Sequence, residues 1–312
     1  MGRTAFIFPG QSSQYVGMGK ELYEKIPVVR EVFDHACELT GKDIRSICFE
    51  GPPEVLNETM NTQPCILTMS YAAFLALKAY GPAPDAIAGF SMGEFSAMVA
   101  AGIVSFDDAL ALLKVRAKAM QEAVPLGEGA MVAVKSDRAQ RAVEICGQIT
   151  EGYAALSNIS SPTTLLFAGE KKAMNILQER LTAEGIKNRI VAVSVPAHCR
   201  LMDPAREPLE KALAKTAMHA PQTDFYMCAD AQKESDVDKI REKEVMQLYM
   251  AAQCEGIIRN MIKDGVDTVV EIGPKNIYAR YAKEIDPSIR ILNVEDMASL
   301  QDTVRALQED KA

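Results

Sequence analysis

Short apolar runs alternate with longer amphipathic segments along most of the chain. The runs of strand length lie at residues 4–8, 85–89, 267–272 and 289–294. Helical patterns fall at residues 20–37, 65–80, 92–101, 105–122, 276–282 and 299–309, and Pro64 is expected at the first helical position of the second of these. Strands that alternate with helices predict a parallel α/β core.

The order of the expected helices and strands changes between residues 125 and 196. Strands are expected at 130–134, 153–158, 164–168 and 188–195, and helices at 137–148 and 171–183. The resulting order β-α-β-β-α-β is that of a ferredoxin-like unit. Because the core pattern resumes afterwards, we predict an inserted small subdomain at residues 125–196, within a core formed by residues 1–124 and 197–312.

Composition narrows the class of protein. Of the 312 residues, 48% are apolar and 24% charged, the mix of a soluble globular protein. The net charge of −8 argues against nucleic acid as a partner. No apolar stretch approaches the roughly 20 residues that span a bilayer. We expect no membrane association, and a monomer by default.

Cysteine and histidine usage bears on metals and on compartment. The seven cysteines form no CxxC pair, and there are only three histidines. This pattern is typical of reduced thiols in a cytoplasmic protein and gives no basis for a zinc site. We expect no metal and no bound cofactor.

Gly89-Phe90-Ser91-Met92-Gly93 matches the G-x-S-x-G pattern between an expected strand and an expected helix. In a nucleophile elbow, a sharp strand-to-helix turn exposes the serine hydroxyl, and small flanking residues let the backbone turn without clashes. The amide of the next residue then points toward an oxyanion. Ser91 is therefore the candidate nucleophile; the alternative is a structural turn with a buried serine.

A serine nucleophile needs a base, and the candidates are His35, His198 and His219. His35 fits the surface or boundary of a helix, and His219 fits a helix end. His198 lies where the inserted segment returns to the core, and clefts form at such junctions. We predict His198 as the base. No acidic residue is marked as its partner, so a backbone carbonyl could orient it instead.

Arg116 lies on the shoulder of the apolar stripe of the helix 105–122. At about 100° per residue, it projects about 160° from Lys114 and Lys118. A guanidinium there is costly unless it is paired. Two interpretations stay open: an internal salt bridge to Glu94 or Glu122, or a clamp for a substrate carboxylate.

Six segments together resemble the malonyl-CoA:acyl-carrier-protein transacylase family, which includes polyketide synthase acyltransferases. They run in order over nearly the whole chain: Phe8–Gln14 (FPGQSSQ) is similar to FPGQGSQ, Gly89–Ser96 (GFSMGEFS) to GHSLGEYS, Arg116 with Met120-Gln121 to R-x-x-x-MQ, Ser194–His198 (SVPAH) to SVPSH, Gln247-Leu248-Tyr249 with Gln253 to QLYNPVQW, and Glu271–Pro274 to E-[IV]-GPG.

The resemblance implies an α/β-hydrolase-like core with a ferredoxin-like insertion, and a role for each matching residue. Ser91 would attack the thioester of malonyl-CoA, and His198 would take its proton. The amides of Gln11 and Met92 would form the oxyanion hole, and Arg116 would bind the malonyl carboxylate. Gln253 would lie near the histidine. The acceptor would be the phosphopantetheine thiol of an acyl carrier protein.

Departures from the family pattern concern selectivity. Ser12 replaces a glycine, Phe90 replaces the histidine that borders the acyl pocket, and Ser160 replaces a second asparagine, whereas Asn158 matches the first. We expect Asn158 and Phe90 at the substrate site. The alternatives are a serine hydrolase of acyl thioesters, a stand-alone polyketide synthase acyltransferase with altered acyl selectivity, and a non-catalytic carrier-binding protein.

Overall fold

The computed structural model describes residues 2–191, 193 and 195–309. Its larger sheet has the strand order β7-β2-β1-β8-β9, and all of its pairs are parallel. Its strands are β1 (Arg3–Phe8), β2 (Ala86–Gly89), β7 (Asp224–Tyr226), β8 (Val266–Ile272) and β9 (Arg290–Val294). The predicted parallel core is therefore confirmed. The short strand β7 escaped the sequence analysis.

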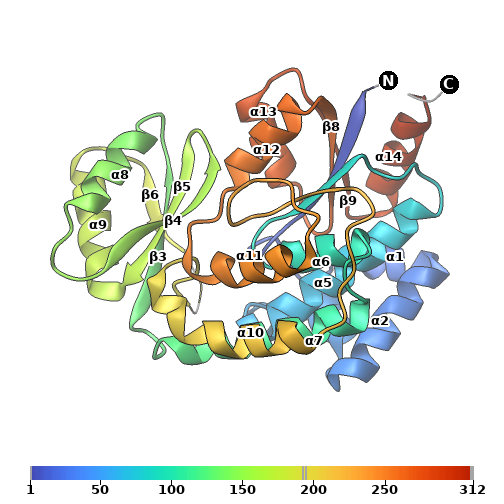
Figure 1. Cartoon of the computed structure of the whole chain (residues 1–312), viewed down its shortest axis with the longest axis horizontal. Coiled ribbons are helices and arrows are strands. Elements are labelled where there is room, and N and C mark those ends of the chain that lie inside the picture. Colours follow the sequence, from blue (N-terminus) through green and yellow to red (C-terminus); the bar gives the residue numbers. More distant parts are fainter. Residues whose placement is uncertain (1, 192, 194, 310–312) are drawn as a thin grey trace.

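Helices cover both faces of this sheet (Figure 1). They are α1 (Lys20–Lys25), α2 (Pro27–Thr40), α3 (Ile44–Phe49), α4 (Pro53–Leu56), α5 (Thr59–Lys78), α6 (Gly93–Ala100), α7 (Phe106–Ala123), the 3-10 helix η1 (Arg200–Ala205), α10 (Arg206–Lys215), α11 (Val237–Tyr249), α12 (Cys254–Lys263), α13 (Tyr278–Ile285) and α14 (Met297–Glu309). None of the helices in the described residues is long and apolar enough to cross a membrane.

Strand β1 shows why the core strands read as continuous apolar runs. Phe6 and Phe8 point to one face, where both rings form T-shaped contacts with Phe74 on α5. Ala5 and Ile7 belong to the separate cluster that includes Ile257 on α12. Side chains alternate between the faces of a strand, so a strand covered on both sides is apolar at every position.

Two helix predictions were wrong in detail. The expected helix 20–37 is divided at Ile26, whose extended backbone separates α1 from α2. Pro64 does not start its helix but lies inside α5, which begins at Thr59. The segment 59–63 carries polar residues that are nevertheless buried, so its hydrophobic pattern gave no helical signal.

The insertion forms a second, four-stranded antiparallel sheet of order β4-β5-β3-β6. Its elements are β3 (Gly129–Lys135), α8 (Ala139–Gly147), β4 (Ala154–Ser161), β5 (Thr164–Glu170), α9 (Lys171–Ala183) and β6 (Asn188–Ile190). Figure 1 shows this unit at one end of the molecule, away from both termini. The predicted β-α-β-β-α-β order is confirmed, although β6 ends earlier than expected. The subdomain boundaries at 125 and 196 stay a prediction.

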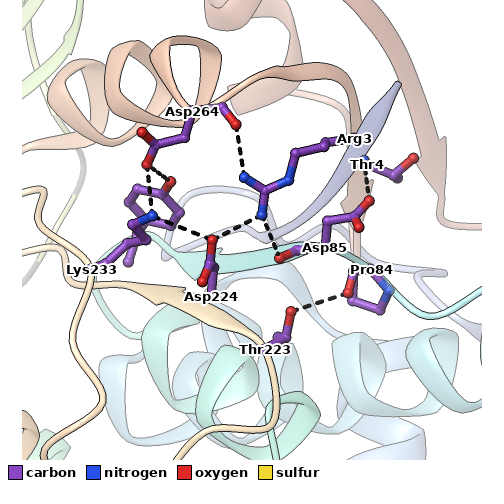
Figure 2. Close-up of polar contacts among 9 residues, drawn as sticks. Arg3, Thr4, Pro84, Asp85, Thr223, Asp224, Lys233 and Asp264 are labelled. Atoms are coloured by element: carbon purple, nitrogen blue, oxygen red, sulfur yellow. Dashed lines mark hydrogen bonds and ion pairs between the residues drawn. The ribbon is translucent and has the colours of Figure 1, made fainter. Parts of the chain in front are cut away.

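Ion pairs join the amino-terminal ends of the core strands (Figure 2). Arg3 donates to the carboxylate of Asp224 at 2.9 Å and to the carbonyl of Asp264 at 2.7 Å. Lys233 pairs with both acids, at 3.4 and 3.1 Å. This network ties β1 and β7 to the turn before β8. It leaves the opposite edge, at the carboxyl ends of the strands, for a binding site.

Candidate active site

Ser91 occupies a sharp turn between β2 and α6. Its φ of 56° lies in the left-handed region, which a serine adopts only where the surrounding structure imposes it. A Cβ on Gly89 would come within 2.2 Å of the Gly93 backbone, and a Cβ on Gly93 within 2.4 Å of the Phe8 carbonyl. Both glycines are therefore required by close backbone approach, as the predicted nucleophile elbow demands.

His198 faces the serine. Its Nε2 lies 2.7 Å from Ser91 Oγ, and its Nδ1 lies 2.7 Å from the backbone carbonyl oxygen of Gln247. A carbonyl only accepts, so Nδ1 carries the proton and Nε2 is left to accept from the serine hydroxyl. Burial, together with the nearby Arg116 charge, lowers the pKa of His198 to about 4. The imidazole is therefore neutral near pH 7, the state a general base needs.

The other two histidines lie elsewhere. The Nε2 of His35 is 2.8 Å from Asp107 on the surface, and His219 is exposed. The sequence analysis excluded these two histidines on the basis of their context, and the remaining one, His198, is the histidine that contacts the elbow. No acidic side chain orients His198 among the described residues; the backbone carbonyl of Gln247 does so.

Arg116 extends from α7 to the same point and is only 1% exposed. One terminal nitrogen lies 3.4 Å from Ser91 Oγ and 3.0 Å from Gln247 Oε1, and the other lies 3.3 Å from Gln63 Oε1. These contacts are made to neutral groups. Burial lowers the pKa of Arg116 to about 10, which still leaves it charged at neutral pH.

The salt-bridge interpretation of Arg116 was wrong. Glu122 lies 3.9 Å from Lys118 at the surface. Glu94 hydrogen-bonds Gln247, which in turn holds Arg116. Within the described part of the chain, no carboxylate lies within ion-pair distance of the guanidinium. A buried cation beside the candidate nucleophile is thus positioned to bind an anion.

A cavity of about 580 Å³ opens on these groups. Ser91, His198 and Arg116 line it, as do Gln11 and Asn158. The loop that carries Gln11 lies against the elbow, because a Cβ on Gly10 would come within 3.5 Å of Ser91 Cβ. Met92 follows Ser91 directly and is the N-cap of α6, so both residues of the predicted oxyanion hole lie beside the elbow; the role of their amides stays a prediction.

Three predicted site residues lie outside the cavity lining: Met92, which is fully buried, Gln253 and Phe90. The side chain of Gln253 donates to the Ala251 carbonyl at 3.0 Å instead of reaching His198. Phe90 is fully buried, and its ring stacks on Tyr278 with centroids 4.1 Å apart. Tyr278 itself lines the cavity, so Phe90 supports the wall from behind. Ser194, part of the SVPAH segment, lies outside the described residues.

The sequence analysis missed three residues. Gln247 was quoted only as part of a motif, although it contacts both His198 and Arg116. Gln63 and Tyr278 were not singled out. A polar residue just before the buried Pro64 is a usable signal for Gln63, whereas only the fold places Tyr278 against the cavity. No cluster of His, Cys, Asp or Glu suited to a metal ion occurs in the part of the chain that the structure describes.

Comparison with known proteins places this geometry in a family. Residues 5–303 match the family model described as an acyl transferase domain. The chain belongs to the acyl transferase family. It is 36% identical over 313 residues to the malonyl CoA-acyl carrier protein transacylase of Bacillus subtilis, with 99% of each chain covered. It is 38% identical to the protein of that name from Escherichia coli K12, with 91% and 93% covered.

Solved structures of this family have the same fold. A malonyl-CoA:acyl carrier protein transacylase from Xanthomonas oryzae superposes with a TM-score of 0.95 at 34% identity, covering 98% of both chains. A type II polyketide synthase acyl carrier protein in complex with its malonyl-transacylase gives 0.94 at 34% identity, covering 97% of this chain and 99% of that one. The predicted fold class, a parallel core with a ferredoxin-like insertion, is confirmed.

Proposed function

We propose that this acyltransferase moves a malonyl group from malonyl-CoA to the phosphopantetheine thiol of an acyl carrier protein, through an acyl-enzyme on Ser91. The observation that supports this proposal most directly concerns Arg116. Its guanidinium is buried, has no carboxylate partner among the described residues and lies 3.4 Å from Ser91 Oγ. The carboxylate of a malonyl group supplies the anion that this cation lacks, in a bidentate geometry that arginine favours. The names of the relatives support the same substrate and acceptor.

The first half-reaction forms the acyl-enzyme. Ser91 Oγ attacks the thioester carbonyl while Nε2 of His198 takes the hydroxyl proton. The oxygen of the tetrahedral intermediate accepts from the amides of Gln11 and Met92. The C–S bond then breaks, and His198 returns the proton to the departing coenzyme A thiolate.

The second half-reaction reverses these roles. His198 takes the proton of the phosphopantetheine thiol, whose sulfur attacks the seryl ester. Collapse of the second tetrahedral intermediate releases Ser91, which regains its proton from His198. The carbonyl of Gln247 accepts from Nδ1–H throughout and stabilises the imidazolium that forms transiently in both halves.

The remaining expectations concern setting and partners. The carrier protein and the coenzyme A thioester are the partners, and the protein acts as a monomer in the cytoplasm. The cysteines support that compartment, because all seven are free thiols, as is usual in a reducing environment. Asn158 borders the acyl group from β4.

Mass spectrometry of the intact protein tests the proposal. After mixing with malonyl-CoA, the wild type should gain one malonyl group, and Ser91→Ala should gain none. Adding a holo carrier protein should move that group to the carrier. Rapid release of free malonate without transfer would instead support the hydrolase alternative. An unmodified wild type would support the non-catalytic one, and efficient labelling by larger acyl-CoA thioesters would support a polyketide synthase acyltransferase with altered selectivity.

A further inference from the structure

Two buried carboxyl groups that do not line the cavity lie close to Gln247, one through a hydrogen bond and the other three residues earlier on the same helix. Glu94 on α6 and Glu244 on α11 are both 0% exposed. One oxygen of Glu94 accepts from the backbone amide of Cys228 at 2.7 Å, and the other accepts from Nε2 of Gln247. The oxygens of Glu244 accept no hydrogen bond from any N–H or hydroxyl group of the described residues. The chemistry proposed above uses neither carboxyl group.

The two carboxyl groups differ in the hydrogen bonds that they accept, and this difference indicates which of them needs a proton. A carboxylate without donors in a dry interior is very costly, whereas a neutral carboxyl group is tolerated and can itself donate. Glu244 has no such donor within the described residues, and burial raises the pKa of both carboxyl groups, each of which also affects the titration of the other. The pair therefore holds at least one proton at neutral pH and titrates as a unit.

Arg116 is a buried positive charge that acts on this pair. It interacts electrostatically with both acids, although the contact that links it to Glu94 runs through Gln247. Removing the proton from the pair adds a further negative charge that interacts with Arg116. In a buried site, that charge weakens the attraction of Arg116 for any second anion on the cavity side.

We propose that Glu244 makes selection of the malonyl group pH dependent: when protonated it leaves the charge of Arg116 available to the acyl carboxylate, and when ionised it repels that carboxylate. This inference rests on the proposed function. Glu244 is a positioning residue in this scheme, because it acts through Arg116 and does not touch the substrate.

Glu244 is expected to titrate in a pH range that experiments can reach. Burial raises the pKa of Glu244 to about 8, against the attraction of Arg116. The same desolvation raises the pKa of Glu94 well above its usual value. The thiol of Cys228, which also faces the pair, has a pKa raised far above 9 and stays neutral. His198 is neutral throughout this range because its pKa is lowered to about 4.

Other charges on α11 and on the helices that pack against it have partners of their own. Arg206 is near Asp203 and Glu210, at 3.8 and 3.9 Å, and these exposed groups are screened by solvent and salt. Lys243 on α11 is partly buried and pairs with both Asp230 and Glu234. Among the described groups near Arg116, the Glu94–Glu244 pair is therefore the one expected to change charge between pH 6.5 and 9.

Acyl-enzyme formation measured from pH 6.5 to 9 tests the inference. For the wild type, the KM for malonyl-CoA should rise about 3- to 30-fold across this range, whereas that for acetyl-CoA should stay nearly constant. Glu244→Gln should remove the rise for malonyl-CoA. Glu207→Gln, an exposed acid on α10, is the matched control and should retain it.

Three results would overturn the inference. An undiminished rise in Glu244→Gln would show that another group is responsible. A parallel rise for malonyl and acetyl would show that pH acts on the chemistry and not on selection. A flat wild-type profile would show that Glu244 does not titrate here. A wild type that forms an acetyl-enzyme but no malonyl-enzyme at any pH would instead reject the proposed function.

Calorimetry supplies a second measurement that does not depend on turnover. Malonyl-CoA binding to Ser91→Ala at pH 8, in two buffers of different ionisation enthalpy, should take up a fraction of one proton. The double variant with Glu244→Gln should take up none, and acetyl-CoA should cause no uptake in either protein. Equal uptake in both proteins would contradict the role of Glu244.

Discussion

The backbone carbonyl of Gln247 lies 2.7 Å from Nδ1 of His198 and fixes the orientation of the imidazole. The side chain of the same glutamine accepts from Arg116 at 3.0 Å. One residue near the end of α11 therefore positions both the candidate base and the candidate carboxylate clamp. Because a side-chain substitution removes only the second contact, the two roles can be separated experimentally.

Gln247→Ala should impair malonyl transfer selectively. The backbone carbonyl and its bond to His198 remain, but Arg116 loses a charge-assisted hydrogen bond worth about 1.5–3 kcal/mol. We expect kcat/KM for malonyl-CoA to fall about 10- to 150-fold, with a smaller change for acetyl-CoA. Gln253→Ala is the matched control. Because its side chain is bonded to the Ala251 carbonyl, kcat/KM should stay within about twofold of the wild type. Equal losses in the two variants would contradict the positioning of Arg116 by Gln247.

On the acid side, kcat/KM for acyl-enzyme formation should begin to fall only at an unusually low pH. A base acts in its neutral form, and burial keeps His198 neutral down to about pH 4. Between pH 7 and 5.5, kcat/KM for acyl-enzyme formation should change less than about twofold, whereas an imidazole of ordinary pKa near 6.5 would lose about tenfold. Stopped-flow measurement of coenzyme A release gives this profile. A midpoint near 6.5 would mean that the imidazole is more hydrated than its burial indicates.

The same depressed pKa has a consequence for stability. The unfolded chain binds a proton at His198 near pH 6.5, before the folded protein does. Stability from this group is therefore complete above pH 6.5 and is lost as the pH falls toward 4. His198→Gln should flatten the decrease in Tm over that interval and reduce transfer about 10²–10⁴-fold. His35→Ala and His219→Ala should leave the transfer rate unchanged.

Local signals carried most of the architecture and the centre of the site. The strand before Ser91 and the glycines around it predict an elbow because the backbone geometry there permits little else. Arg116 was found because its helix position is incompatible with a solvated charge. By contrast, Gln247 and Gln253 belong to one motif, and only the path of the chain decides which of them meets His198.

Buried polar residues account for much of what the sequence analysis missed. The residues Thr59, Asn61, Thr62 and Gln63 are polar yet buried at the start of α5, so hydrophobic periodicity could not place that start. The sequence analysis named Glu94 only as a possible partner of Arg116 and did not single out Glu244, although both are fully buried. Tertiary contacts determine such positions, and no local pattern reports them.

Exposed basic residues of the insertion and of the segment after His198 should govern carrier binding. Acyl carrier proteins are generally acidic, and a protein of net charge −8 needs a local positive surface to attract one. From sequence proximity to His198 and the insertion, we predict Lys187, Arg189, Arg200 and Arg206. All four are exposed, and the first two line the cavity. Arg200 lies over the ring of Tyr153, 4.0 Å from its centroid.

Lys187→Glu combined with Arg189→Glu should raise KM for the carrier while leaving the malonyl-enzyme burst nearly unchanged. The increase should shrink at high salt, because exposed charges are screened over about 10 Å at 0.1 M. Lys25→Glu with Arg30→Glu, on the distant helices α1 and α2, reverses the same number of charges and should have little effect. Should both pairs act alike, net charge and not a docking surface would be the cause.

Arg116→Ala should change selectivity more than it impairs the chemistry. The guanidinium is buried beside Ser91 and contacts Gln63 and Gln247, so a bound malonyl carboxylate would be its ionic partner. Losing one member of such a pair costs about 2–5 kcal/mol, so kcat/KM for malonyl-CoA should fall roughly 30- to several-thousand-fold. Acetyl-CoA has no carboxylate and leaves the buried cation without a partner, so its kcat/KM should be equal or improved.

Measuring kcat/KM for both thioesters together with Tm distinguishes this clamp from a structural role. If Arg116 were structural, its loss would lower Tm and would lower kcat/KM for both substrates in parallel. Arg116→Lys is the informative companion, because it keeps a positive charge but not the planar fork, and it should recover only part of the malonyl preference.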